Sequence, residues 1–233
     1  MHVKFLILTL TPCIIGVAVL WQSERITIGE IFGASSFFLH IAAYAWYLRD
    51  IIAQKILPNI SSWLMWLFGA WIEYLTYNSI TGSHWSTSAL PFACALGMSS
   101  IVLVMLLLQI NQGRSTSSDI RFVKPEKVDY LLITFDVTAA AIWLFWDAPE
   151  FANIVAVSTS IVTFIPIWRS TYKAPTNERF EPWALWSCAY LAMAGAVVLS
   201  GNTEINLAQL FYPLYYLVLH AVVLILAART GYR

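Results

Sequence analysis

Charged residues are scarce in this sequence. Only 11% of the 233 residues are charged and 59% are hydrophobic, whereas soluble domains have about 25% charged and about 45–50% apolar residues. The 13 basic and 13 acidic residues cancel, so the net charge is zero. A water-soluble fold of this size cannot bury so much apolar surface. The neutral balance also lacks the basic excess typical of proteins that bind nucleic acid.

Cysteine is scarce as well. The three cysteines are Cys13, Cys94 and Cys188, and no CxxC pair or other metal-ligand spacing groups them. The sequence also contains no nucleophile beside a base and no cluster of His, Cys, Asp and Glu at ligand spacing. We therefore expect no metal site, no cofactor and no enzymatic activity.

Long apolar runs occupy most of the chain. A helix needs about 20 apolar residues to cross about 30 Å of hydrocarbon, and runs near this length cover residues 5–21, 28–48, 62–80, 90–110, 128–146, 151–168, 183–200 and 207–228. They predict an all-α polytopic membrane protein with eight transmembrane helices in a single membrane domain, residues 1–233. Gly29 and Gly33, four residues apart, predict a close helix contact in the second run.

The Lys and Arg residues test this count, because they concentrate in the cytoplasmic loops of membrane proteins. With eight spans, one side of the membrane carries Arg25 alone. The other side carries Lys4, Arg49, Lys55, Arg114, Arg121, Lys124, Lys127, Arg169, Lys173, Arg179, Arg229 and Arg233. This asymmetry predicts an integral plasma (inner) membrane protein with both termini in the cytoplasm.

A displacement of 120 residues relates the two halves of the chain. It places Arg169 on Arg49 and Trp186 on Trp66, and Pro213 corresponds to Pro91 when a gap of two residues is allowed. We predict a first repeat over residues 1–110, a cytoplasmic linker over 111–127 and a second repeat over 128–233. An even number of helices in each unit makes the two repeats parallel.

The segment PIWRSTYKAPTNERFEPW, residues 166–183, ends one apolar run, crosses a basic turn and begins the next run. This pattern resembles the PQ-loop and SWEET superfamily of small-solute transporters, with Pro166-Ile167 and Ala45-Trp46 at the positions of the family's Pro-Gln dipeptide. The resemblance implies two three-helix bundles, spans 2–4 and 6–8, with span 5 as a linker helix and span 1 as an extra helix. It also implies alternating access about a central site, with three prolines as hinges: Pro166, Pro91 and Pro213.

Ionisable side chains in the middle of apolar spans indicate function, because each costs about 2.5–3.5 kcal/mol on insertion. Glu73, Asp136, His40 and His220 occupy such positions, with Glu73 about 16 Å into its span. None of them is duplicated in the repeat, as expected for a site. We predict that they bind a solute or couple protons, together with Tyr77, Asn78, Tyr216, Trp66 and Trp186. The alternative is that these groups only hold the helices together by hydrogen bonds.

Two functions fit these features. A carrier for a small polar solute, working by alternating access and in one version coupled to protons through Glu73, requires a polar, water-accessible cavity around that residue. A non-transporting subunit or assembly factor of a larger membrane complex requires a filled core and a membrane protein partner. Both functions leave homo-oligomerisation open, and the sequence does not identify the solute.

Overall fold

The computed structural model describes residues 26–53, 55, 60–112, 127–175, 178–200 and 207–229. The span expected over residues 5–21 and nearly all of the linker expected over 111–127 lie outside these ranges. Within them every regular element is a helix, and the all-α fold class is confirmed.

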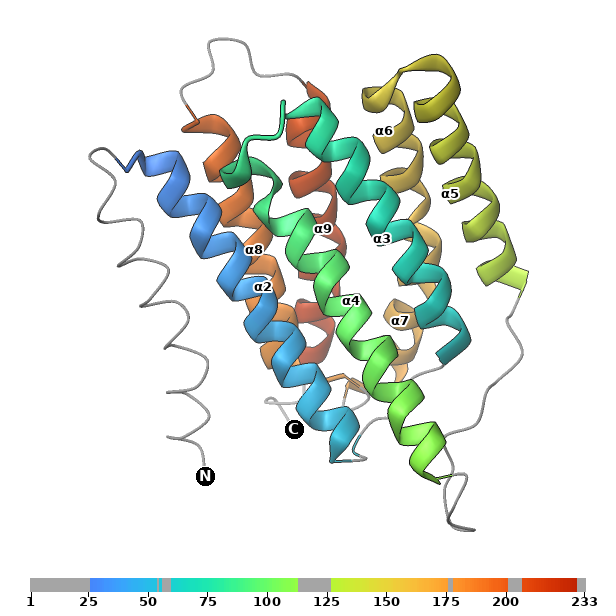
Figure 1. Cartoon of the computed structure of the whole chain (residues 1–233). Coiled ribbons are helices and arrows are strands. Elements are labelled where there is room, and N and C mark those ends of the chain that lie inside the picture. Colours follow the sequence, from blue (N-terminus) through green and yellow to red (C-terminus); the bar gives the residue numbers. More distant parts are fainter. Residues whose placement is uncertain are drawn as a thin grey trace.

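Eight helical segments follow one another along the described chain. They are α2 (Ile28–Ile52), α3 (Ile60–Ile80), α4 (Trp85–Gln112), α5 (Lys127–Trp146), α6 (Pro149–Thr159), α7 (Ile161–Lys173), α8 (Phe180–Val198) and α9 (Leu207–Ala228). Consecutive segments reverse direction, except that α7 continues the path of α6 (Figure 1). The expected spans differ from these bounds by at most five residues at either end, but the sixth is divided into two helices.

The first described helix begins at a capping box. The hydroxyl of Thr27 accepts a hydrogen bond from the backbone N–H of Glu30 (3.2 Å), and the Glu30 carboxylate accepts one from the backbone N–H of Thr27 (2.8 Å). These two bonds satisfy N–H groups that a helix start otherwise leaves unpaired. They fix the point at which α2 enters the bundle.

The division of the sixth span falls at Ser160. The backbone N–H of Ser160 bonds to the carbonyl of Val157, and the N–H of Thr163 bonds to the carbonyl of Ser160. Both bonds span three residues instead of the four of an α-helix, which tightens the chain locally. The helix does not end near Pro166 as expected, because α7 continues to Lys173.

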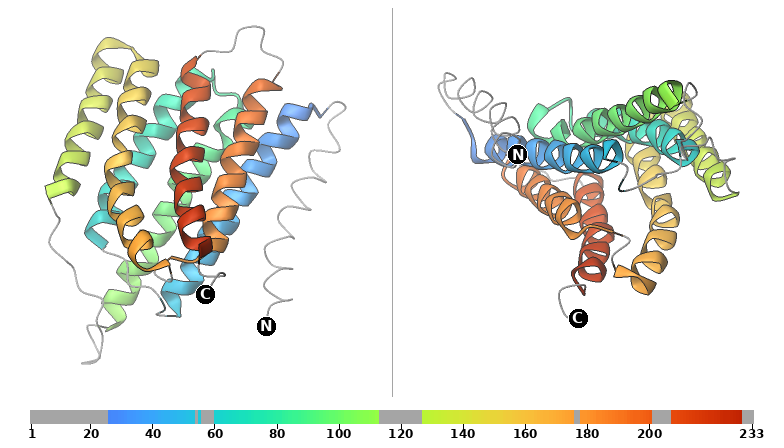
Figure 2. Two further views of the ribbon diagram at one scale, coloured as in Figure 1. Left: turned by 180° about the vertical axis from the view of Figure 1, so that it is seen from behind. Right: turned by 90° about the horizontal axis from the view of Figure 1, so that it is seen from below.

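Two sets of three spans pack in the same order. The third span of the first set, α4, packs against both α2 and α3, and the third span of the second set, α9, packs against both α8 and the α6–α7 pair. The sets meet where α2 packs against α8 and where α3 packs against α6 (Figure 2). Helix α5 lies at the side of the bundle against α3 and α6 (Figure 1).

Close helix contact occurs at the predicted glycine pair of α2. A Cβ on Gly29 would lie 2.7 Å from the carbonyl oxygen of Leu199, and a Cβ on Gly33 would overlap the backbone of Ser86. Each glycine thus lets α2 approach another segment more closely than any larger residue would allow. The prediction of a close contact here is confirmed.

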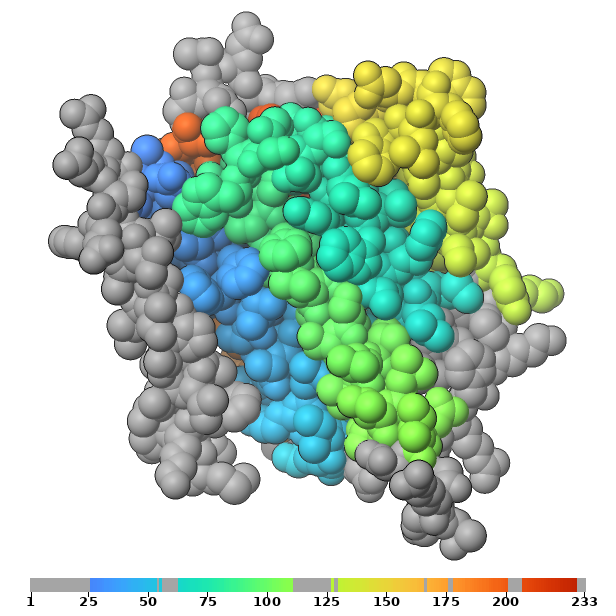
Figure 3. Space-filling view, in the orientation of Figure 1, coloured from blue at the N-terminus to red at the C-terminus, as the bar shows by residue number. Residues whose placement is uncertain are grey.

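Four helical stretches are long and apolar enough to cross a membrane: Ile28–Ile52, Trp85–Ile110, Pro149–Lys173 and Leu207–Ala228. Residues 130–146 form a shorter apolar helix. Outward-facing side chains are also apolar, as at Leu103, Leu107 and Ile110 of α4, whose face is shown in Figure 3. Apolar surface of this kind is typical of contact with lipid, and the chain is a membrane protein.

The expected count of eight spans is not reproduced by hydropathy. Helices α3 and α8 have 21 and 19 residues, enough to cross the hydrocarbon, but they fall outside the set of apolar spans. Their tryptophan, tyrosine and serine side chains, and Glu73 in α3, lower the hydropathy of each helix. Many of these polar and aromatic groups turn inward, as the next section describes.

The described Lys and Arg residues gather at one end of the bundle, where α2, α4, α7 and α9 end and α3, α5 and α8 begin (Figure 1). They are Arg49, Lys55, Lys127, Arg169, Lys173, Arg179 and Arg229. The opposite end carries acidic residues: Glu30, Asp147 and Glu150. The charge asymmetry expected from the loops is thus present in the described structure as a difference between the two ends.

Candidate functional site

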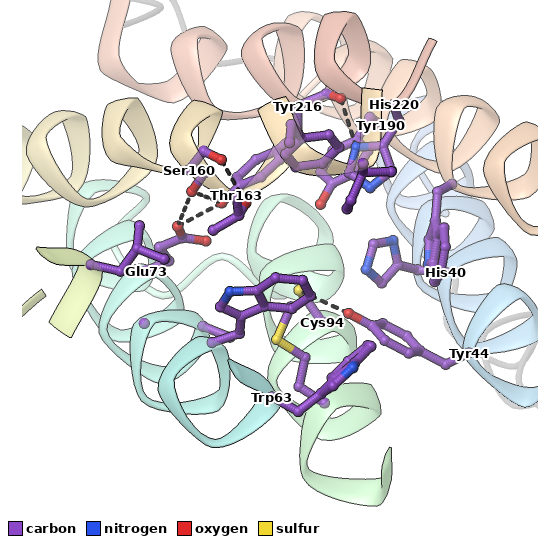
Figure 4. Close-up of a pocket in the computed structure, with 18 of the residues that line it drawn as sticks. His40, Tyr44, Trp63, Glu73, Cys94, Ser160, Thr163, Tyr190, Tyr216 and His220 are labelled. Carbon is purple, nitrogen blue, oxygen red and sulfur yellow. Dashed lines mark hydrogen bonds between the residues drawn. The ribbon is translucent and has the colours of Figure 1, made fainter. Parts of the chain in front are cut away.

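A cavity of about 390 Å³ lies inside the bundle between the two sets of spans (Figure 4). Every helical segment from α2 to α9 contributes at least one side chain to its lining. The cavity extends from Glu73, in the middle of α3, to Glu178 in the loop between α7 and α8. It therefore runs from the middle of the bundle towards the end that carries the basic residues.

Most of the residues predicted as a site line this cavity. They are Glu73, Asp136, His40, His220, Tyr216, Trp66 and Trp186. The other two predicted neighbours do not line it: the Tyr77 hydroxyl donates to the carbonyl oxygen of Gln209 (2.7 Å), and the Asn78 amide donates to the hydroxyl of Ser83 (3.1 Å). Tyr77 lies one turn beyond Glu73 on the same face, but α9 already closes against α3 at that level.

Glu73 is the centre of a hydrogen-bonded group that joins three helices. Its carboxylate oxygen Oε1 accepts from the hydroxyl of Tyr216 on α9 (2.6 Å) and from the hydroxyl of Ser160 between α6 and α7 (3.3 Å). The Ser160 and Tyr216 hydroxyl oxygens are themselves 2.6 Å apart. Glu73 is only 6% exposed, so these hydroxyls take the place of water around a buried acid.

Two residues in and just after α6 support this group without having been predicted. Ser160 contributes its hydroxyl from the break in the helix, and Asn153 is fully buried against α3. The Asn153 amide donates to the backbone carbonyl of Glu73 (3.2 Å) and to the hydroxyl of Thr76 (3.0 Å). The only sequence signal for them was a run of hydroxyl side chains, residues 158–160, within an apolar span.

Asp136 approaches the same part of α3 from α5. A Cβ on Gly69 would lie 2.7 Å from the Asp136 oxygen Oδ2, so the absence of a side chain at Gly69 leaves room for the carboxyl group. Gly69 precedes Glu73 by one helical turn and shares its face. The Asp136 carboxyl group thus reaches α3 about one turn before Glu73, and both residues line the cavity.

The two histidines flank Tyr190 of α8. The ring centroids of His40 and His220 lie 5.4 Å and 4.9 Å from that of Tyr190. His220 donates from Nδ1 to the backbone carbonyl of Tyr216 (2.8 Å), one turn earlier in α9. His40 is 1% exposed, and neither of its ring nitrogens has a hydrogen-bond partner among the described residues.

Two tryptophans of the lining also have polar groups without a hydrogen-bond partner among the described residues. The indole N–H groups of Trp66 and Trp186 are buried and have no acceptor within the described part of the chain. Buried polar groups are paired in most proteins, because an unpaired donor or acceptor costs about 1–3 kcal/mol. Three side chains that line this one cavity, His40 and the two tryptophans, thus have polar atoms without a partner among the described residues.

At the end of the cavity nearest the basic residues, Glu178 accepts a hydrogen bond from the indole N–H of Trp183 (3.0 Å). Burial raises the pKa of the Glu178 carboxyl above its usual value, and the bond from Trp183 offsets part of this rise. Nearby, Arg49 binds the buried Asp50 through two nitrogens (2.9 and 3.1 Å). Arg179 of the second set of spans lies 3.8 Å from the other oxygen of Asp50.

The three predicted hinge prolines all lie inside helices. Pro91 and Pro213 are buried, each at the seventh residue of its helix, α4 and α9. Residue 166 lies within α7. The one interruption of a described span is at Ser160, and the hinge role of the prolines stays a prediction.

No three His, Cys, Asp or Glu side chains in the described ranges come together as a group that could hold a metal ion. Comparison of the chain with protein-family models, curated proteins and solved structures gave no significant match.

Proposed function

We propose that this protein is an integral membrane carrier for a small polar solute, which works by alternating access between two helical bundles. The observation that carries the proposal is the cavity between the two sets of spans, with Glu73 at its inner end. The volume of about 390 Å³ lies in the range of about 300–1,000 Å³ that is usual for small-molecule sites.

The order of packing supports two related bundles. Within each set the third span lies between the other two, and between the sets the first span of one packs against the second span of the other, α2 on α8 and α6 on α3. This exchange of roles is what a twofold axis along the membrane normal produces. This packing order fits the repeat expected from the sequence, with α5 as the linker helix. It also fits the resemblance to the PQ-loop and SWEET superfamily.

The Glu73 group provides the connection between the bundles. Glu73 belongs to the first bundle, while Ser160 and Tyr216 belong to the second. A movement of one bundle against the other would break these hydrogen bonds and leave the carboxyl group, which lines the cavity, without its hydroxyl partners. Loss or gain of a proton at Glu73 would then accompany the movement, which is how a carrier of this design would couple transport to protons.

The orientation follows from the charge asymmetry. The end of the bundle that carries the described Lys and Arg residues would face the cytoplasm, with both termini on that side of the plasma (inner) membrane. The cavity extends towards this same end, at Glu178 and Trp183. The conformation described here would therefore be one in which the site lies nearer the cytoplasm.

The alternative, a non-transporting subunit of a larger complex, requires a filled core. A cavity beside Glu73, with unpaired polar groups in its wall, favours the carrier. In a subunit, the buried polar groups would serve only to join one helix to another by hydrogen bonds. His40, Trp66 and Trp186 make no side-chain hydrogen bond within the described residues, so they do not serve this purpose.

The test compares the purified wild-type protein with Glu73→Gln in liposomes. Thermal unfolding is measured against a panel of sugars, amino acids, vitamins and amines at two pH values, and uptake is measured for every solute that stabilises the protein. Asp147→Asn is the matched control, because Asp147 is an exposed acid outside the cavity whose left-handed backbone (φ 49°) asparagine tolerates.

The carrier predicts that at least one solute stabilises the wild type and is taken up, and that Glu73→Gln reduces the effect while Asp147→Asn does not. If no solute stabilises the protein or crosses the membrane, the carrier is excluded. Co-purification of the protein from its native membrane would then identify the partner that the subunit requires.

A further inference from the structure

We propose that the cavity binds a small organic cation that also carries a hydrogen-bond acceptor, in preference to a sugar or an anion. This inference rests on the proposed function and specifies its substrate class. Three independent properties of the lining support it: its charge, its aromatic surface and its unpaired polar groups.

The charged groups of the lining are all acidic. Glu73, Asp136 and Glu178 line the cavity, and no Lys or Arg occurs among its described lining residues. Two arginines lie close in sequence to lining residues, Arg49 after Tyr47 and Arg179 after Glu178, but both form ion pairs with other acids. Arg49 binds Asp50, and Arg179 binds Asp50 and Glu181. A buried carboxylate without a counter-charge is unfavourable, so a positively charged ligand would supply the charge that the protein does not.

The wall between these acids is aromatic. The rings of Tyr44, Trp183 and Tyr190 line it, and the Trp186 ring lies 5.3 Å from that of Tyr44 and 5.2 Å from that of Trp183. Aromatic faces attract cations by their quadrupole, most strongly when both partners are removed from water. An anion would meet the acids of the lining and would be repelled.

The unpaired groups specify the rest of the ligand. The indole N–H groups of Trp66 and Trp186 donate only, so they require an acceptor. The imidazole of His40, 1% exposed and without a partner among the described residues, offers one donor and one acceptor. A cation with a hydroxyl or carbonyl oxygen satisfies the donors, whereas a purely hydrocarbon cation leaves them unpaired.

The first test uses pairs of ligands that differ in charge alone. Choline is compared with 3,3-dimethylbutan-1-ol, in which carbon replaces the ammonium nitrogen. Acetylcholine is compared with the acetate ester of the same alcohol. Binding to the full-length wild-type protein in lipid nanodiscs is followed by tryptophan fluorescence and by thermal shift. We expect the cation of each pair to bind roughly tenfold more tightly than its neutral analogue.

The second test assigns the preference to the cavity. Asp136→Asn and Glu73→Gln should each reduce the preference for the cation over its neutral analogue, while Asp147→Asn should leave it unchanged. The wild-type comparison needs no variant, so it remains decisive if either substitution prevents folding. Tetramethylammonium, which has the charge and no acceptor, should bind more weakly than choline.

The outcomes separate this inference from the proposed function. Equal binding of cations and neutral analogues, or a cation preference that survives both substitutions, would overturn the organic-cation assignment. If a sugar or an anionic solute from the wider panel is bound and transported instead, the carrier stands and only the substrate class is wrong. If nothing binds and nothing is transported, both proposals fail.

Discussion

The hydroxyl of Tyr216 on α9 donates a hydrogen bond of 2.6 Å to the carboxylate of Glu73 on α3. The two residues are separated by 143 positions in the sequence, and they belong to different sets of spans. Both are buried, so the bond is shielded from water. The relationship ties the two halves of the bundle together at the inner end of the cavity.

Removal of this hydroxyl should therefore loosen the contact between the halves. We expect Tyr216→Phe to lower the free energy of unfolding by about 0.6–2 kcal/mol, the usual range for hydrogen bonds between helices in a membrane. Thermal unfolding in detergent measures the loss, with Tyr130→Phe as the control because Tyr130 is exposed on α5. In a double-mutant cycle with Glu73→Leu, which removes the acceptor, the two losses should be less than additive. Strict additivity would contradict a direct bond.

The free energy of unfolding should depend more on the charge than on the size of the side chain at position 153, which is Asn153 in the wild type. Its amide donates to the backbone carbonyl of Glu73 and to the hydroxyl of Thr76, and Asn153→Asp would replace this donor by a buried carboxylate facing two oxygens. We expect Asn153→Asp to cost about 3–5 kcal/mol, as for an unpaired buried charge. Asn153→Leu has the same number and branching of side-chain heavy atoms and no charge, and it should cost only about 1–2 kcal/mol.

The comparison of these two variants uses thermal unfolding and the yield of monodisperse protein after extraction. Asn153→Leu is the milder change because it introduces no charge, and Thr76 still donates to the carbonyl of Ile72 in either variant. If both substitutions cost the same, the amide of Asn153 makes no specific contact with α3, and the position is one of packing alone.

The sequence allowed the ionisable members of the cavity to be predicted, for a simple physical reason. An ionisable side chain in hydrocarbon costs free energy whatever the arrangement of the helices. It could therefore be predicted without knowledge of the packing that four such residues would be buried together: Glu73, Asp136, His40 and His220. The depth of each residue within its span was enough to suggest that they would lie at a similar level in the bundle.

The remaining members depend on how the helices pack. Asn153 and Ser160 are ordinary polar residues until α6 is placed against α3, and nothing local in the sequence specifies that contact. Tyr77 was predicted from its helical spacing to Glu73. This spacing shows that the two residues share a face of α3, but it does not show how far along the helix the cavity extends. The structure places it where α9 closes against α3, so its hydroxyl bonds to the Gln209 carbonyl instead of facing the cavity.

Gly33 is a packing position that the spacing to Gly29 did identify. A methyl group there would overlap the backbone of Ser86 at the start of α4, and backbone cannot move aside as a flexible side chain can. We expect Gly33→Ala to lower the free energy of unfolding by about 1–3 kcal/mol through overpacking. Ser35→Ala, two residues away on the exposed side of α2, is the control in thermal unfolding. Equal stability of the two variants would contradict the close contact.

Glu178 should make the stability of the protein depend on pH. Burial raises the pKa of its carboxyl in the folded state, so between the unfolded pKa, about 4.3, and the raised folded pKa the folded protein binds more protons than the unfolded chain. Stability then falls as the pH rises through this interval. The loss is complete above the folded pKa, where burial of the charged form disfavours folding.

Glu178→Gln removes this titration while it keeps an oxygen that can accept the hydrogen bond from Trp183. The difference in melting temperature, variant minus wild type, should therefore increase as the pH is raised from about 4 and should level off above the folded pKa. Differential scanning fluorimetry across this range measures it, with Asp147→Asn as the control for loss of an exposed acid. A difference that stays constant with pH would mean that Glu178 ionises in the folded protein as freely as in water, and that the cavity is open to solvent at this end. A difference that decreases would mean that the folded protein stabilises the charged carboxylate, which also contradicts a raised pKa.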